Sequence, residues 1–135
     1  MSAAATPSAL ARTLRVLAIA LGTLLVAGET LRSWGQGRPL ASVLDDYLLG
    51  GALIATALLF RAGDLRRRAA FAAAWGAASG GLYGSFFSKL FAPAGASFSS
   101  NIPDGWLTGL IGAAYATSLF GVVATIAMQP RRFSD

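Results

Sequence analysis

Apolar residues gather in four long runs along the chain, and charged or turn-forming residues separate the runs. The runs cover residues 14–32, 43–61, 69–89 and 106–128, and each is close to the length of about 20 residues that a helix needs to cross a bilayer. Inside hydrocarbon the backbone must satisfy its own hydrogen bonds, so such runs are expected to be helical. The pattern predicts an all-α polytopic membrane protein. Its four transmembrane helices form an up-down antiparallel bundle, with residues 1–135 as a single membrane domain.

The composition agrees with a membrane protein and removes much of the usual catalytic chemistry. Hydrophobic residues make up 55% of the chain and charged residues 13%, which is far more apolar than an ordinary soluble domain. There is no cysteine and no histidine, which excludes thiolate nucleophiles, imidazole bases, and Cys or His ligands for zinc or iron–sulfur centres. We therefore expect no enzymatic activity, no cofactor and no metal site.

The basic residues lie near the ends of the apolar runs and are divided unequally between the two sides. Eight of the eleven are on the side that holds both termini and the second connector: Arg12, Arg15, Arg61, Arg66, Arg67, Arg68, Arg131 and Arg132. The opposite side has Arg32, Arg38 and Lys89. The positive-inside rule places both termini in the cytoplasm, and the protein is expected in the plasma (inner) membrane.

The arginines before the third run, Arg66, Arg67 and Arg68, also predict a partner. A net charge of +5 is compatible with nucleic-acid binding, but few polar side chains accompany these arginines to read bases. Anionic lipid headgroups are the favoured partner at this site. The expected partners are therefore the lipid bilayer, anionic headgroups at these three arginines, and either a second copy of the chain or another membrane protein. Nucleic acid is not expected.

The first run permits a second interpretation, as a cleavable signal peptide. Basic residues precede the short apolar stretch 16–28, and the small residues of "VAG" stand immediately before Glu29. Cleavage would leave three spans in the same orientation. An uncleaved span is favoured because the run continues through Thr30 and Leu31 to Arg32.

The connectors contain helix-start signals. Asp64 precedes the third run and Asp104 precedes the fourth, and each is placed to accept hydrogen bonds from free amides at a helix N-terminus. The third connector, residues 91–105, is rich in Ser, Gly and Pro. It is long enough either to be mobile or to fold back on the bundle.

Small residues recur at every fourth position in the last two runs. The third run has Ala72, Gly76, Gly80, Gly84 and Ser88, and the fourth has Gly105, Gly109, Ala113, Thr117 and Gly121. Such ridges allow helix backbones in lipid to approach closely. We expect Gly76, Gly80 and Gly84 to pack against Gly105 and Gly109. Homodimerisation through one ridge is the alternative.

Five charges flank the first connector: Glu29, Arg32, Arg38, Asp45 and Asp46. Asp45 and Asp46 stand near the start of the second run, where the helix dipole favours acids, and Arg32 ends the first run, where it favours a cation. Glu29 has no such explanation, because it lies near the C-terminal end of its helix, where the dipole opposes a negative charge.

The direction of the Glu29 side chain is a further clue. Eleven and seven residues before it stand Ala18 and Gly22, small residues on the same side of the helix. Counted from Asp46, the same side of the next helix carries Gly50, Leu53 and Ala57. Glu29 is therefore expected to point into the bundle, where acids are usually paired or functional.

Together with Lys89 at the end of the third run, these charges form a candidate site: Glu29, Arg32, Asp45, Asp46 and Lys89. One hypothesis is an ion or proton site. The other is an ion-pair cluster at the outer membrane boundary. The cluster is favoured because three cations on this side face four acids, so most charges could neutralise one another.

Two functions follow from this sequence, and carboxylate catalysis by Glu29 and Asp45 is a third hypothesis that no nucleophile–base spacing or cofactor motif supports. The leading hypothesis is a small integral membrane protein without catalytic activity, an accessory or self-associating subunit packed through glycine ridges. The alternative is a small proton- or cation-coupled transporter or channel that uses the acidic residues at the outer boundary.

Overall fold

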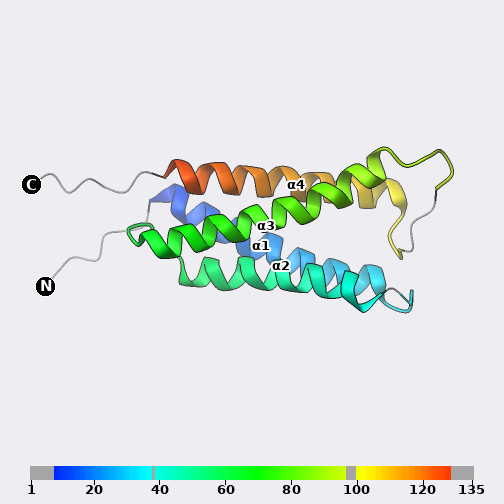
Figure 1. Cartoon of the computed structure of the whole chain (residues 1–135), viewed down its shortest axis with the longest axis horizontal. Helices are drawn as coiled ribbons and strands as arrows, with labels where there is room; N and C mark the ends of the chain where they lie inside the picture. The colour runs from blue at the N-terminus through cyan, green and yellow to red at the C-terminus, as the bar shows by residue number, and fades with distance from the viewer. Residues whose placement is uncertain (1–7, 38, 97–99, 129–135) are drawn as a thin grey trace, which may run out of the picture.

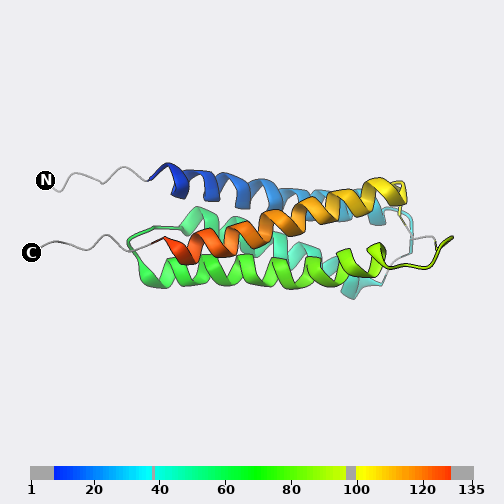
Figure 2. The same cartoon turned by 90° about the horizontal axis from the view of Figure 1, so that it is seen from above.

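The computed structural model describes residues 8–37, 39–96 and 100–128, and all regular structure in this part of the chain is α-helical. The helices are α1 (Ala9–Ser33), α2 (Leu40–Leu59), α3 (Leu65–Leu90) and α4 (Asp104–Ala127). They run alternately up and down in one elongated bundle (Figure 1), and a view from above shows the same side-by-side arrangement (Figure 2). Helix α1 packs mainly on α2, and α3 on α4, while an α2–α3 contact joins the two pairs. The predicted all-α class and the four helices are confirmed.

The two ends of the bundle differ in charge. Helices α1 and α3 begin, and α2 and α4 end, at what we call the arginine end, which carries Arg12, Arg15, Arg61, Arg66, Arg67 and Arg68. At the opposite end, which we call the acidic end, α1 finishes near Glu29 and α2 begins near Asp45 and Asp46. The helix order thus gathers residues from distant parts of the sequence at each end.

Only one of the two predicted acidic caps forms. Asp64 is the N-cap of α3, and its Oδ1 accepts hydrogen bonds from the backbone N–H of Arg66 at 3.0 Å and of Arg67 at 3.2 Å. The same prediction for Asp104 is wrong, because Pro103 takes the N-cap position of α4 and Asp104 is already the first helical residue. A capping side chain must come from the residue just outside the helix.

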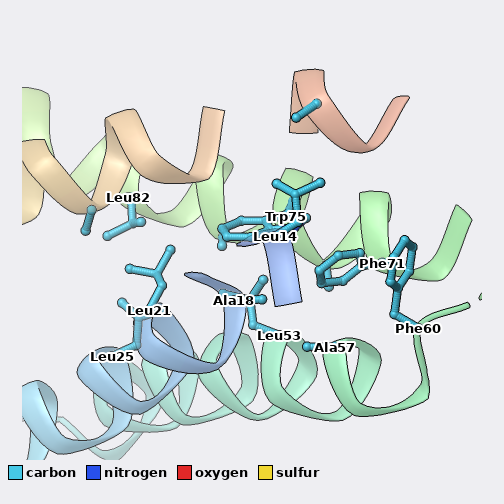
Figure 3. Close-up of a cluster of buried hydrophobic side chains, with 14 of the residues drawn as sticks. Leu14, Ala18, Leu21, Leu25, Leu53, Ala57, Phe60, Phe71, Trp75 and Leu82 are labelled. Atoms are coloured by element: carbon cyan, nitrogen blue, oxygen red, sulfur yellow. The ribbon is translucent and has the colours of Figure 1, made fainter. Parts of the chain in front are cut away.

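Large apolar side chains fill the bundle towards the arginine end. Leu14, Leu53, Phe71 and Trp75 come from α1, α2 and α3 and are fully buried. The close-up in Figure 3 shows Phe60, Phe71 and Trp75 in one row, with ring centroids 4.6 Å and 5.8 Å apart along it. Tilted aromatic contacts of this kind add to the stabilisation from burial alone. This core fixes which face of each helix points inward.

Helices α1 and α2 make their closest approach at two buried glycines, Gly22 and Gly50. A Cβ added to either residue would lie 2.6 Å from the carbonyl oxygen of the other. Real Cβ atoms do not come this close to backbone, so only glycine fits at this crossing. Both residues lie on the inward faces inferred from Glu29 and Asp46, and that inference is confirmed.

The α3–α4 contact is made by different residues from those expected. A Cβ on Gly121 would overlap the indole of Trp75, and one on Gly112 would lie 2.8 Å from the ring of Phe86. Midway along the helices, Ser79 Oγ donates to Ser118 Oγ at 2.9 Å, and both serines are buried. Small residues on α4 therefore accommodate aromatic rings from α3.

The predicted packing of the glycine ridges on each other needs correction. Gly76, Gly80 and Gly84 on α3, and Gly105 and Gly109 on α4, are all exposed. A Cβ on any of them would meet nothing within 4 Å. The physical reason is that spacing by four marks one side of a helix without saying whether this side faces inward. Here Phe71, Trp75 and other large side chains take the inward face.

Among the residues that the structure describes, two helices, α1 and α4, are long and apolar enough to cross a membrane by length and composition. Buried core helices, and signal sequences near an N-terminus, can have the same composition. The four-span arrangement is therefore a proposal beyond this finding.

Candidate functional site: the charge cluster at the acidic end

Glu29 is buried at the acidic end of α1, with 2% of its surface exposed. The position follows from helical periodicity, because Ala18, Gly22 and Leu25 on the same face are also buried. Its carboxylate accepts hydrogen bonds from Arg32 Nη2 and from Ser33 Oγ, one turn further along α1. A carboxylate this deeply buried requires such partners, because leaving one uncompensated costs several kcal/mol, about 3–5 when a buried pair is broken.

Arg32 connects α1 to α2. Its Nη2 contacts Glu29 Oε2 and lies 3.3 Å from Asp46 Oδ2, so one guanidinium group serves carboxylates on two helices. The Arg32 side chain is only 12% exposed, and its Nε is buried without a hydrogen-bond partner in the described part of the chain. We call Glu29, Arg32, Ser33 and Asp46 the charge cluster. It closes the α1–α2 hairpin beyond the Gly22–Gly50 crossing.

The two aspartates of α2 lie further inside the helix than the sequence pattern predicts. Helix α2 begins at Leu40, so Asp45 and Asp46 fall in its second turn, and its first turn holds no acid. The helix dipole acts mainly within the first turn, so it does not account for these acids. Asp46 is explained by its contact with Arg32.

Asp45 faces α3 of the second helix pair, and Lys89 is a residue of that helix. Asp45 is exposed, and its Oδ2 lies 4.0 Å from where a Cβ on Gly81 of α3 would be. Lys89, in the last turn of α3, lines an open groove of about 540 Å³ between α3 and α4, together with Asp104, Thr108 and other residues. The predicted site residues therefore share the acidic end, and ion pairs join Arg32 to Glu29 and to Asp46.

A hydroxyl pair extends the α1–α2 contact beside the charge cluster. Thr30 Oγ1 donates to Val26 O at 2.8 Å, one turn back along α1. Its oxygen also pairs with the hydroxyl of Tyr47 on α2. Because the threonine proton is used on Val26, Tyr47 is the donor in this pair.

The sequence left two alternatives for the third connector, a mobile segment or one that folds back on the bundle. Residues 100–103 at its end fold back onto α1. Asn101 Nδ2 donates to the carbonyls of Leu31 at 2.9 Å and Trp34 at 3.1 Å. Its Oδ1 accepts from Gln36 Nε2 at 2.6 Å. Asn101 therefore satisfies carbonyls at the C-terminus of α1. The sequence analysis did not predict this role, because the only indication of it is a single side-chain amide in a Ser-rich connector.

Three arginines at the arginine end also donate hydrogen bonds to backbone carbonyls near helix C-termini. Arg15 Nε donates to Ala57 O at 3.0 Å, Arg67 Nη1 donates to Leu59 O at 3.2 Å, and Arg68 Nη1 donates to Met128 O. These acceptors lie in or beside the last turns of α2 and α4, where carbonyls lack partners within the helix. Of the three arginines predicted to bind lipid headgroups, two thus bind protein carbonyls.

The charge cluster can hold two helices together, and its chemistry is that of charge pairing. Within the described residues, no group of three or more acidic side chains is placed to hold a metal ion. Histidine and cysteine are absent from the whole chain. No protein-family model, curated protein or solved structure matches this chain.

Proposed function

We propose that the chain is a small integral membrane protein without catalytic activity, an accessory or self-associating subunit of the plasma membrane. In this proposal all four helices cross the bilayer, the arginine end and both termini are cytoplasmic, and the acidic end is extracytoplasmic. The observation that carries it is an uncharged zone between the two charged ends.

The uncharged zone runs through the middle part of all four helices. No charged residue occurs in the stretches 16–28, 47–60, 69–88 and 105–128. Many large apolar side chains within it are exposed, including Leu24 on α1, Leu58 on α2 and Val123 on α4. Soluble monomers rarely expose large contiguous apolar surfaces, whereas lipid tails cover such a surface favourably. The zone therefore supports membrane insertion of the whole bundle.

The outward glycine ridges support association with another helix in the membrane. Gly76, Gly80 and Gly84 leave open space on α3, and Gly105 and Gly109 do so on α4. In lipid, such small-residue surfaces allow close backbone approach between helices. The contact expected within the chain is instead made by other residues, so both ridges remain accessible to a second chain.

Replacing Gly80 by isoleucine is expected to weaken self-association while leaving the monomer folded, because the added side chain points into open space. The oligomeric mass of the purified protein in mild detergent measures this effect, and helical content by circular dichroism checks the fold. The matched control is Gly51→Ile, an exposed glycine of α2 outside the ridges. A wild-type chain that is monomeric and copurifies with no membrane protein would contradict the proposed subunit function.

Ion transport is the second candidate, and the burial of Glu29 within the charge cluster favours it. Intramembrane acids are common elements of proton and cation pathways. In this case wild-type protein in proteoliposomes would carry proton or cation flux, and Glu29→Gln would abolish it without loss of helical content. Wild-type proteoliposomes without flux would remove this candidate and leave the cluster with a structural role.

A further inference from the structure

The basic residues at the arginine end fall into two groups according to what their side chains contact. Arg15, Arg67 and Arg68 donate to helix carbonyls, and Arg67 Nε also pairs with Asp64 Oδ2 at 3.2 Å. The second group, Arg12, Arg61 and Arg66, is exposed, and these side chains have no hydrogen-bond or ion-pair partner in the described part of the chain. Position in the sequence does not predict this division, since Arg66 and Arg67 are neighbours.

Arg15, Arg67 and Arg68, the first group, stabilise the fold through these hydrogen bonds. A guanidinium on the last carbonyls of a helix supplies a donor where the helix offers none or, for Ala57 O, only the N–H of the C-cap residue Phe60 at 3.4 Å. It also interacts favourably with the negative end of the helix dipole. Arg68 in particular joins the start of α3 to the end of α4. Withdrawing these side chains to bind a ligand would leave the carbonyls exposed to the membrane interface.

The second group is positively charged without local compensation. In the described residues, Asp64 is the acid at this end, and its carboxylate is already used by two amides of α3 and by Arg67. Arg12 belongs to the first turn of α1, Arg61 follows α2 and Arg66 belongs to the first turn of α3. Three guanidinium groups from three elements therefore stand at one end of the bundle with their donors available.

We propose that Arg12, Arg61 and Arg66 form a contact surface for the phosphate groups of anionic phospholipids in the cytoplasmic leaflet. This inference rests on the proposed membrane insertion, which places the arginine end at the headgroup level. The planar guanidinium fork matches two oxygens of a phosphate, and juxtamembrane arginines are attracted to anionic leaflets. It assigns lipid binding to Arg12, Arg61 and Arg66 instead of to the consecutive arginines 66–68.

The test compares lipids retained by the full chain. Wild-type protein is reconstituted into nanodiscs with equal amounts of phosphatidylglycerol and phosphatidylcholine, and retained lipid is counted by native mass spectrometry. Enrichment of phosphatidylglycerol is expected, with each arginine that faces an anionic headgroup contributing up to about fivefold in binding. The triple variant Arg12→Gln, Arg61→Gln, Arg66→Gln should remove most of this enrichment. Excess inorganic phosphate should leave the ratio unchanged if the partner is the lipid rather than free phosphate.

The control variant Arg67→Gln, Arg68→Gln removes two charges from the first group. It should keep most of the enrichment and instead lower thermal stability, because the affected carbonyls are those of Leu59 and Met128. Enrichment that survives the triple variant, or is lost equally in the control, would overturn the assignment.

The same preparation separates this inference from the proposed function. If alkaline carbonate releases the wild-type protein from membranes, membrane insertion fails and the lipid surface fails with it. If the protein stays in the membrane but shows no lipid preference, only the lipid surface fails.

Discussion

Replacing Gly50 by alanine is expected to destabilise the bundle by about 1–3 kcal/mol, the usual cost of forcing extra atoms into a packed contact. The new methyl group would lie 2.6 Å from the carbonyl oxygen of Gly22 and 2.9 Å from Val26 Cγ2. The Val26 side chain could turn away, but the Gly22 carbonyl oxygen can move only if α1 and α2 separate. Such a separation would also weaken the Arg32–Asp46 contact at the acidic end.

The neighbouring residue provides the matched control. Gly51 is exposed, and a Cβ there meets nothing within 4 Å. Gly51→Ala should therefore stabilise the helix by about 0.5–1 kcal/mol, since alanine loses less backbone entropy than glycine on folding. Unfolding of both variants in mild detergent, followed by ellipticity against added denaturing detergent, measures the difference. Equal effects at the two positions would show that the α1–α2 crossing does not depend on a close backbone approach.

The helices were predictable from the sequence because they depend on long, uninterrupted patterns. The four apolar runs lie within or at the edges of the four observed helices, and the ends differ by one to several residues. The inward direction of Glu29 was also predictable, since Ala18 and Gly22 share its side of the helix. Both predictions use helical periodicity alone, and periodicity is a local property of the chain.

The packing partners were less predictable because they depend on which side chains fill the space between helices. A glycine every fourth residue was expected to mark the α3–α4 contact, yet Gly80 and Gly109 face outward. The glycine that does matter on α4, Gly121, is identified only by the indole of Trp75 that lies against it. A sequence pattern shows which side of a helix carries the small residues. Whether that side packs against another helix depends on the large residues of the neighbouring helix.

Interactions between distant residues were missed for a related reason. Asn101, just before α4, caps the C-terminal end of α1, and Arg68, in the first turn of α3, does the same for the end of α4. Each contact joins residues at least 60 positions apart in the chain, since the Arg68 to Met128 separation is 60 and the Asn101 to Leu31 separation is 70. The charges of the arginine end were therefore assigned to lipid as one group, although only part of the group is available to bind it.

Replacing Arg32 by methionine is expected to have the largest effect on stability, about 3–5 kcal/mol, because it removes the cation from a buried ion pair. Methionine keeps the length and apolar stem of the side chain but donates no hydrogen bond. Glu29, which is 2% exposed, would lose its ion pair with Arg32. Asp46 would lose the ion pair that joins it to α1. Arg12→Met is the control on the same helix. Arg12 is exposed and outside the charge cluster, so a change within about 0.5 kcal/mol is expected there.

A double-mutant cycle shows whether this loss comes from the Glu29–Arg32 pair itself. Arg32→Met takes the Arg32 guanidinium away from the buried Glu29 carboxylate. Adding Glu29→Gln removes the charge of that carboxylate, so part of the lost stability should return. The two single changes should therefore be non-additive, with a coupling of about 1–3 kcal/mol for residues in direct contact. Additive effects would mean that Glu29 does not depend on Arg32 in the folded state. In that case the buried carboxylate would need a different role, and proton or cation flux would become the better explanation for its place inside the bundle.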